Sequence, residues 1–505
     1  MSLKSTLARL YAAHVVRSTE RWASHPLEVQ MRWLHKLVNT AKHTQFGKDH
    51  DFTSIKNYDD FKKRVPINDY EGLKNYIEKI KAGQSDVLWP GKPLYFAKTS
   101  GTTSGTKYIP ISRESMPYHI AGARNMLLHY IHRSGKVDFV DGKMIFLQGS
   151  PILSDTNGIK TGRLSGIVAH YVPAYLQRNR MPSWDTNCIE DWEAKVEAIV
   201  RETVKEDMRL ISGIPPWVQM YFERLLHYTG KATVSEVFPN FSLMVIGGVA
   251  FEPYQKIFDK LIGKTIDTLE LYPASEGFIA YQDQPDNRDL LLLLDGGIFF
   301  EFIPADKFFE SNPPRYHIGE VKTGVNYAVI LNTNAGLWGY NIGDTIEFTS
   351  TSPYRIRVTG RIKHFISAFG EHVIGSEVEY AINQAIKAHG GRINEFTVAP
   401  QVTPPEGGLP YHEWWIEFDE MPADMSAFAL TLDQALQDKN VYYKDLITGK
   451  ILRPAVIRTL PKNAFNQYMK SIGKLGGQNK LPRLSNDRKI AEQLEKFFSN
   501  QQVDL

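Results

Sequence analysis

The sequence predicts an α/β protein with a large N-terminal domain of mixed sheets and a smaller, mobile C-terminal α+β domain. Three observations lead to this prediction. A strand, a helix and a strand follow one another between residues 242 and 276, apolar and polar residues alternate from 297 to 358, and strands then alternate with helices beyond residue 360. The chain has 505 residues, of which 42% are hydrophobic, so it can form more than one folding unit with a sizeable core.

The N-terminal part is predicted to be a pair of helices that cap the main core. Its apolar residues recur at helical spacing as far as a break at residues 46–47. They are Leu3, Leu7, Leu10, Tyr11, Val29, Trp33, Leu34, Leu37 and Val38.

A stretch rich in glycine and hydroxyl groups, FAKTSGTTSGTKYIPIS, spans residues 96–112. Residues 93–97 are typical of a short buried strand, and residues 108–112 are extended because Pro110 excludes a helix there. We therefore expect a loop between them. It combines flexible glycines, hydroxyl donors and one fixed positive charge, which together suit a polyphosphate. The residues concerned are Ser100, Gly101, Thr102, Thr103, Ser104, Gly105 and Lys107.

This stretch does not fit the Walker phosphate loop. Thr106 stands where the second glycine of that motif belongs, and Tyr108 follows the lysine in place of serine or threonine. A P-loop NTPase is therefore disfavoured. The alternative to phosphate binding is a mobile surface loop rich in hydroxyl groups.

Residues 242–276 form the clearest unit of the chain. A strand (SLMVI) leads to Gly247 and Gly248, a helix opens at Pro253, and a second strand (TIDTLELY) follows. This order predicts a parallel βαβ crossover. Because ligands of open α/β sheets bind beyond the carboxyl ends of the strands, Gly247, Gly248 and the stretch after Leu271 are candidate site residues.

The remaining elements complete the two domains. Residues 297–358 are predicted to be an antiparallel meander with a turn at 334–336. A helix at 376–390, strands at 395–400 and 413–418, and a helix at 426–438 then predict a compact α+β module. We place the boundary near Gly360 and Arg361, which gives domains of 1–360 and 361–505.

Charge and cysteine content restrict the partners and the compartment. The formal net charge is +3 from 59 basic and 56 acidic residues, so no global field favours nucleic acid or an anionic membrane. Cys188 is the single cysteine, which excludes an internal disulfide and fits a reducing compartment. The N-terminus has no cleavage signature, and Asp295 interrupts the most apolar later run. We expect a cytoplasmic protein whose oligomeric state, a monomer included, stays open.

Three further short stretches combine with the glycine-rich one. In YPASEG, Tyr272 offers an aromatic face for a base and Glu276 a carboxylate for Mg²⁺ beside a phosphate. In YNIGD, Asp344 offers two acceptors for a ribose diol. In GGQNKLPR, Lys480 lies on a glycine-flexible loop. Taken singly, each also fits a turn or a tail without a ligand.

Taken in order, these stretches resemble the adenylate-forming superfamily of acyl-activating enzymes, and most closely its auxin-responsive branch, the acyl-acid amido synthetases. The resemblance covers nearly the whole chain. Its five motifs are residues 99–107 (phosphates), 247–250 with 272–276 (adenine), 340–344 (ribose), 360–363 (interdomain hinge) and 478–480 (mobile domain). The branch is indicated by Ser275, where acyl-CoA synthetases usually carry threonine, by the ending Lys480-Leu-Pro-Arg483, and by helices leading to residues 44–47.

The resemblance implies ATP and Mg²⁺ as cofactors and a role for each motif. Tyr272 would stack on adenine, Asp344 would hold the ribose, and Arg361 would mark the moving joint, although a solvated basic turn is the alternative for Arg361. Glu276 would bind Mg²⁺, and Lys480 would bridge the carboxylate and the α-phosphate, with Lys107 assisting. The β- and γ-phosphates would be held by Thr99, Ser100, Gly101, Thr102, Thr103, Ser104 and Gly105.

The implied reaction makes an acyl-adenylate, releases pyrophosphate, and then transfers the acyl group to the amine of an amino acid. The small domain would close over the reactive anhydride and rotate to admit the second substrate. Small carboxylic acids and amino acids would be the partners, but neither the acid nor the amino acid can be specified. The segments 165–171 and 211–217 lie where acyl-binding helices belong, although core packing is the favoured reading for most of their residues.

Two departures from the branch pattern leave one alternative open. The phosphate stretch reads Thr-Ser-Gly-Thr-Thr in place of Ser-Ser-Gly-Thr-Ser, which keeps the hydroxyls and the glycine spacing. Asn479 stands where the branch often has an aromatic residue, and a similar stretch, Gln467-Tyr-Met-Lys470, lies just upstream. We prefer Lys480 as the catalytic lysine because Pro482 and Arg483 follow it.

Other functions remain as alternatives. An acyl-CoA synthetase would use the coenzyme A thiol as acceptor, and a non-catalytic protein would only bind nucleotide. A serine hydrolase is disfavoured because the sequence has no Gly-x-Ser-x-Gly stretch. A zinc site is disfavoured because His412-Glu413 lacks a second histidine.

Overall fold

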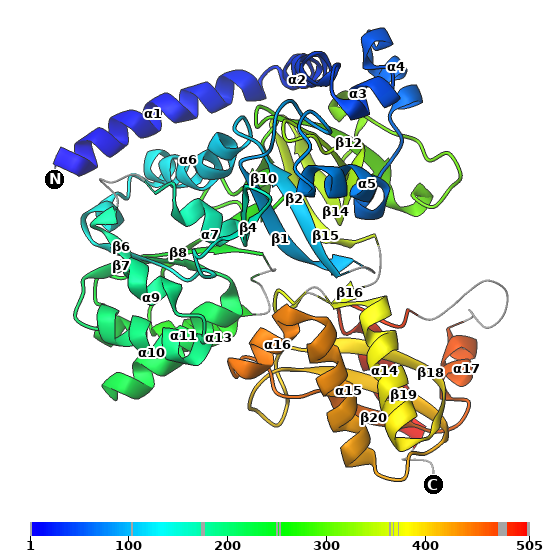
Figure 1. Ribbon diagram of the computed structural model, residues 1–505. Coiled ribbons are helices and arrows are strands. Elements are labelled where there is room, and N and C mark those ends of the chain that lie inside the picture. Colours follow the sequence, from blue (N-terminus) through cyan, green and yellow to red (C-terminus); the bar gives the residue numbers. More distant parts are fainter. Residues whose placement is uncertain are drawn as a thin grey trace. The chain divides into compact units, whose positions relative to one another are not determined.

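The structure is a computed structural model of mixed α/β architecture, which confirms the predicted fold class (Figure 1). It describes residues 3–102, 105–172, 177–248, 251, 254–362, 365–366, 368–371, 373–472 and 482–501. The chain divides into two compact units. The first comprises residues 1–99 and 106–362, and the second comprises residues 363–505 together with 100–105.

The first unit contains a mixed eleven-stranded sheet in the order β12-β13-β14-β15-β11-β10-β9-β8-β7-β3-β6. Its parallel part comprises β3 (Lys143–Phe146), β6 (Arg180–Met181), β7 (Met208–Gly213), β8 (Leu243–Gly247) and β9 (Asp267–Ala274). Its antiparallel part comprises β10 (Gly277–Tyr281), β11 (Leu290–Leu292), β12 (Ile298–Pro304), β13 (Asn326–Thr333), β14 (Tyr340–Thr351) and β15 (Tyr354–Arg361).

Two predictions about this sheet are confirmed. Strands β8 and β9 pair in parallel, as the βαβ pattern predicts, and α13 (Gln255–Ile262) lies between them in sequence. Pro253, where we expected the helix to open, lies outside the described residues. Strands β12 to β15 pair antiparallel in sequence order, as predicted for the meander.

The glycine-rich stretch differs from its prediction. We expected a loop between residues 98 and 107, but β1 (Tyr95–Thr102) and β2 (Gly105–Ile111) run into it from both sides. Threonine favours extended backbone, so the hydroxyl-rich sequence continues each strand towards the turn. Both strands belong to a four-stranded sheet in the order β2-β1-β5-β4, with β4 (Ser154–Thr156) and β5 (Ile159–Gly162).

The predicted pair of N-terminal helices is confirmed as α1 (Leu3–Ala23) and α2 (Pro26–Ala41). Helix α2 buries all five of its predicted apolar residues, but α1 leaves Leu7 57% and Leu10 67% exposed. It instead packs Ala12 and Val15 into a core shared with residues of α6 (Met116–Ser134). Small side chains at this contact let the two helices approach closely, and helical spacing alone did not identify which face is buried.

The first unit's other helices are α3 (Gln45–Asp49), α4 (Tyr58–Arg64), α5 (Tyr70–Lys81), α7 (Leu164–Ala169), α9 (Trp184–Cys188), α10 (Trp192–Thr203), α11 (Pro215–Thr229) and α12 (Val234–Val237). Short 3-10 turns occur at η1 (Phe52–Ser54), η2 (Asp138–Asp141), η4 (Ala305–Lys307) and η5 (Ile318–Glu320). Cys188 is the last residue of α9 and is half-buried.

The second unit is built on the sheet β18-β19-β20. The predicted helix at 376–390 and strands at 395–400 and 413–418 correspond to α14 (Gly375–His389), β18 (Arg392–Gln401) and β19 (Tyr411–Glu420), and the helix at 426–438 corresponds to α15 (Met425–Lys439). The sequence analysis did not identify β16 (Phe365–Ile366), β17 (Val373–Ile374), α16 (Val441–Thr448), β20 (Val456–Leu460), α17 (Ala464–Ser471) or α18 (Lys489–Gln501). Among the helices that the structure describes, none is long and apolar enough to cross a membrane.

Candidate active site

The candidate adenine and ribose residues contact each other. The hydroxyl of Tyr272 in β9 donates to Oδ2 of Asp344 in β14, with 2.6 Å between the two oxygens. Both side chains are half-buried, and the residues are 72 positions apart in the sequence. The fold therefore places an aromatic ring, a group suited to stacking on a base, beside a carboxylate, a group suited to accepting hydrogen bonds from a diol.

The Asp344 stretch, YNIGD, opens β14 and follows β13 along the chain, so Asp344 lies in a strand and not in the turn that was its alternative. Asp344 pairs with Arg361 in the ladder between β14 and β15. The adjacent Ile362 N–H donates to the Gly343 carbonyl at 2.8 Å. The backbone of the predicted hinge is thus hydrogen-bonded to the backbone of the predicted ribose motif.

Gly247 and Gly248 lie at the carboxyl end of β8, as predicted. Gly247 pairs with Leu271 of β9, so it lies beside the backbone of Tyr272. Gly248 has φ of 87°, and a Cβ atom there would lie 2.9 Å from Cγ2 of Ile214. Both the backbone conformation and the space at Gly248 therefore require glycine.

Ser275 and Glu276 form the turn between β9 and β10, and both are half-buried. Strand β9 extends to Ala274, beyond the predicted end of the strand at Tyr272, so Tyr272 lies inside the strand and not at its end. Within the residues that the structure describes, no group of three or more His, Cys, Asp and Glu side chains is arranged to hold a metal ion. Mg²⁺ that is bound mainly through substrate phosphates needs only one or two carboxylate ligands from the protein. Glu276 supplies one such carboxylate.

The phosphate candidates lie on β1 and β2. Thr99 of β1 and Lys107 of β2 are half-buried. The backbones of Ser100, Gly101 and Thr102 lie in β1 and that of Gly105 in β2. Thr103 and Ser104 lie outside the described residues.

Lys480 lies outside the described residues, whereas Lys470 lies in the last turn of α17 and is exposed. Arg483, from the same predicted motif as Lys480, is anchored to two elements of the second unit. Its guanidinium donates to Glu395 in β18 and Glu379 in α14, both at 3.0 Å. It also lies over the ring of Phe396, 5.2 Å from the ring centre.

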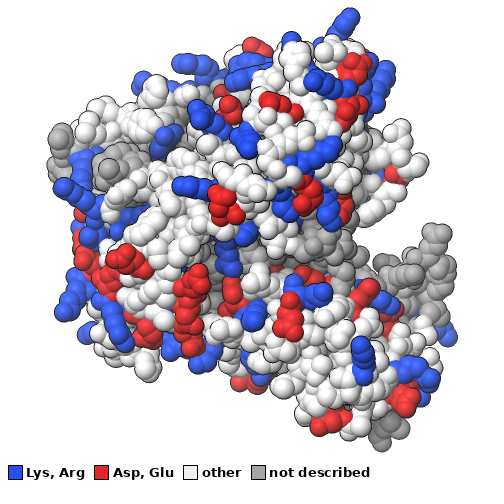
Figure 2. Space-filling model, viewed as in Figure 1, with Lys and Arg blue, Asp and Glu red and all other residues white. Residues whose placement is uncertain are grey.

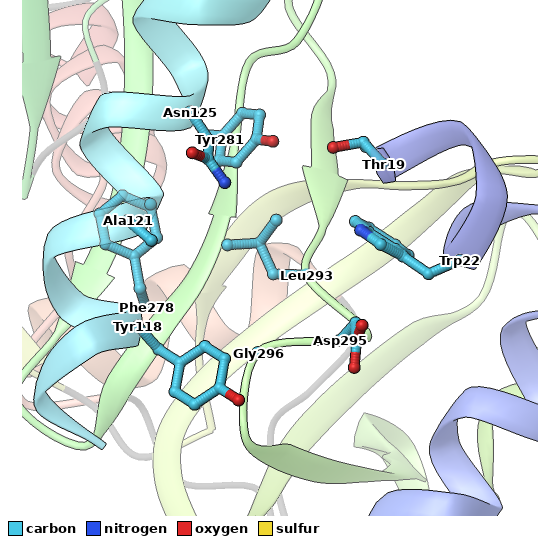
Figure 3. Close-up of a pocket in the computed structure, with 11 residues that line it drawn as sticks. Thr19, Trp22, Tyr118, Ala121, Asn125, Phe278, Tyr281, Leu293, Asp295 and Gly296 are labelled. Atoms are coloured by element: carbon cyan, nitrogen blue, oxygen red, sulfur yellow. The ribbon is translucent and has the colours of Figure 1, made fainter. Parts of the chain in front are cut away.

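A cavity of about 60 Å³ lies between α1, α6 and the β10–β11 region (Figure 3). Its lining includes Phe278 and Tyr281 of β10, which closely follow Glu276 in sequence. Gly122 of α6 allows the Phe278 ring to pack against the helix, since a Cβ atom there would lie 2.3 Å from its Cγ. Cavities that bind benzene measure about 150 Å³. This cavity is too small for an aromatic acid, so we assign no substrate to it.

The two segments between the phosphate and adenine motifs contribute to the core, the reading favoured for most of their residues. Ile167 in α7 and Ile211 in β7 are fully buried. Sequence reasoning did not identify α6, whose residues line the cavity. In the sequence, the two adjacent small residues Ala121 and Gly122 were the signal that could have indicated a close contact on this helix.

Charged side chains of both signs are interspersed over the face of the molecule in Figure 2. This face therefore offers no broad patch of one charge sign, and an anion site would depend on individual groups. The lysine and hydroxyl candidates on β1 and β2 are groups of that kind.

Comparison with known proteins finds the same family in three segments of the chain. Three domain models of one family, GH3, match: the N-terminal domain at residues 15–190, the central domain at 291–361 and the C-terminal domain at 376–489. The chain is 20% identical to an indole-3-acetic acid-amido synthetase of Arabidopsis thaliana, over 92% of this chain and 90% of the relative. It is 25% identical to a jasmonoyl–L-amino acid synthetase of Oryza sativa subsp. japonica, over 91% and 92%.

A solved structure shares the fold. The acyl acid amido synthetase AtGH3.15, solved in complex with 2,4-DB, superposes with a TM-score of 0.62 at 16% sequence identity. The match covers 96% of both chains. This chain and the solved structure therefore have the same fold over nearly their whole length.

Proposed function

Because this chain belongs to the GH3 family, we propose that it is an acyl-acid amido synthetase that uses ATP to join a small carboxylic acid to an amino acid. The plant relatives named above are amido synthetases and match over about nine tenths of their length. The contact between Tyr272 and Asp344 is the observation that supports the proposal most directly, because it brings together the two residues that we assign to the base and the ribose.

The first half-reaction is electrostatically demanding. A carboxylate oxygen attacks the α-phosphorus of ATP, a new P–O bond forms, and the bond to the β-phosphate oxygen breaks to release pyrophosphate. Negative charge builds on the phosphoryl oxygens as one anion approaches a polyanion. Tyr272 and Asp344 would hold the nucleoside so that the attacking oxygen and the leaving group lie in line.

Cationic and donor groups would offset this charge. We assign the β- and γ-phosphates to residues 99–105, with Lys107 assisting. Lys480 would bridge the carboxylate and the α-phosphate. Glu276 would hold Mg²⁺, which neutralises phosphate charge when it is bound. In the second half-reaction the amino-acid amine attacks the acyl carbonyl, the amide bond forms, and AMP leaves.

The proposal also assigns domains and a compartment. Residues 1–360 would bind ATP and the acid, and residues 361–505 would carry Lys480 in a mobile domain. The division of the chain after residue 362 into two compact units supports this boundary. A single cysteine is in keeping with the reducing cytoplasm.

Pyrophosphate exchange tests the first half-reaction. Purified protein with Mg²⁺-ATP and a pool of aromatic and aliphatic acids should incorporate labelled pyrophosphate into ATP only when an acid is present. Lys480→Ala should abolish the exchange, and the matched variant Lys470→Ala should keep it. Loss in Lys470→Ala alone would reassign the catalytic lysine. No exchange with any acid, in protein that binds ATP, would favour the non-catalytic alternative.

The acceptor is then identified from the product. With an active acid, the protein receives a mixture of amino acids or coenzyme A, and the products are analysed by mass spectrometry. An acyl–amino acid amide is expected. Accumulation of an acyl thioester only with coenzyme A would support the acyl-CoA synthetase alternative.

A further inference from the structure

One peptide unit at the entrance to β14 is held at both ends by asparagine side chains. Nδ2 of Asn68 donates to the Trp338 carbonyl at 2.9 Å. Oδ1 of Asn332 accepts from the Gly339 N–H at 2.7 Å. The Trp338 carbonyl and the Gly339 N–H belong to the same peptide plane, so the two asparagines fix its orientation.

The glycine makes this restraint necessary. Gly339 has φ of 55°, and a Cβ atom there would lie 2.1 Å from the Pro66 carbonyl oxygen, so no other residue fits. Glycine, however, leaves the backbone free to adopt other orientations. The side chains of Asn68 and Asn332 therefore restrict the backbone at Gly339, which glycine itself would leave flexible.

The restraint continues through the backbone towards Asp344. The Asn68 N–H donates to the Gly339 carbonyl, and the Asn341 N–H donates to the Asn68 carbonyl, both at 2.7 Å. Oδ1 of Asn341 then accepts from the Gly343 N–H at 2.8 Å. Asp344, the partner of Tyr272, is the next residue.

Asn332 is itself fixed by a buried ion pair. Its Nδ2 donates to Oε2 of Glu301 at 2.9 Å, and both residues are fully buried. Arg315 pairs with both oxygens of the same carboxylate, at 2.9 and 2.7 Å. A charged bidentate pair of this kind is rigid, so the Oδ1 of Asn332 has one defined position.

We propose that Asn68 and Asn332 are positioning residues that act on the nucleotide through Asp344. They hold the Trp338–Gly339 peptide in the orientation that places the Asp344 carboxylate for the ribose. The proposal rests on the proposed function of Asp344 as the ribose ligand. Neither asparagine belongs to a motif of the sequence, and Asn68 is 276 residues away from Asp344 in the chain.

The experiment measures AMP binding to the full-length protein by isothermal titration calorimetry. Asn68→Ala removes the hydrogen bonds to the Trp338 and Pro66 carbonyls. The loss of the bond to Trp338 should weaken AMP binding by roughly 2- to 10-fold. The matched control is Asn57→Ala, which removes the N-cap of the nearby α4 through its bond to the Asp60 N–H. It should lower thermal stability without changing AMP affinity. If Asn68→Ala does not fold, Asn68→Leu keeps approximately the size of the side chain and removes the donor without adding a charge.

A double-mutant cycle separates the positioning role from a structural one. In an Asp344→Ala background, Asn68→Ala should have no further effect on AMP binding. An equal loss in both backgrounds, or unchanged affinity in the single Asn68 variant, would overturn the inference. If Asp344→Ala itself leaves AMP affinity unchanged, the proposed ribose role fails, which is a distinct result.

Discussion

At the residue scale, Tyr272 combines two groups that substitution can separate. Its ring is the candidate stacking surface for adenine, and its hydroxyl donates to Asp344. Tyr272→Phe keeps the ring and should raise the KM for ATP by roughly 2- to 10-fold with little change in kcat. Tyr272→Ala also loses stacking and should raise it further. Pyrophosphate exchange at varied ATP measures both, and an unchanged KM in Tyr272→Phe would show that the hydrogen bond is unimportant.

Lys195 is a buried cation that sequence analysis did not single out. It is 1% exposed, and its Nζ donates to the carbonyls of Gln148 at 3.1 Å and Asn187 at 2.7 Å. Burial is the main cause that lowers its pKa to about 8; Cys188 opposes the shift, and Arg163 contributes to it. The folded state therefore holds this proton less tightly than the unfolded state does.

This shift predicts a pH dependence of stability. Between pH 8 and the ordinary lysine pKa of 10.5, the unfolded state binds more protons, so the free energy of unfolding rises with pH. Relative to Lys195→Met, the wild type should gain up to about 1.4 kcal/mol per pH unit in this window. Chemical denaturation at pH 7.5 and 9.5 measures the change. The exposed Lys231→Met is the control and should show no such gain.

At the element scale, the entrance to β14 depends on Gly339, which has positive φ and no room for a side chain. Gly324 also has positive φ, 74°, but a Cβ atom there would meet nothing within 4 Å. Gly324→Ala should therefore cost only backbone strain, on the order of 1 kcal/mol. Gly339→Ala adds a clash with the Pro66 carbonyl and should cost at least 2 kcal/mol more. Urea denaturation compares them, and equal losses would contradict the close contact.

Elements with a strong local pattern were predictable, and those defined by tertiary packing were not. The βαβ unit and the meander follow from strand alternation and turn residues, and both are present. The buried face of α1 depends on its contact with α6, which helical spacing does not reveal. The glycine-rich stretch contains both loop-forming and strand-forming residues, and pairing with neighbouring strands decided between them.

The distinction between local pattern and tertiary contact also applies to the candidate site. Motif spacing identified Tyr272 and Asp344, and the structure brings them into contact. Asn68 and Asn332 were not predictable, because their role depends on one peptide plane that lies far from Asn68 in the sequence. Hydrogen bonds between distant residues leave no local signal in the composition.

At the scale of the whole molecule, each unit has its own core. The second unit packs Trp415, Phe465, Tyr468 and Leu494 into a cluster of its own residues. We expect residues 363–505 to fold when expressed alone. Residues 1–362 should bind AMP but fail to support pyrophosphate exchange, because Lys480 is missing. Calorimetry and the exchange assay measure the two properties. Exchange by the 1–362 fragment at the full-length rate would contradict the assignment of the catalytic lysine to the second unit.

The single half-buried thiol at the end of α9 gives the chain a ready attachment point for a fluorescent dye. A second cysteine introduced at an exposed position of the other unit, such as Leu430 at 72% exposure, would accept the partner dye. Energy transfer between the two dyes would then report the distance between the units in single molecules. No native cysteine would have to be removed first, because the sequence contains only this one.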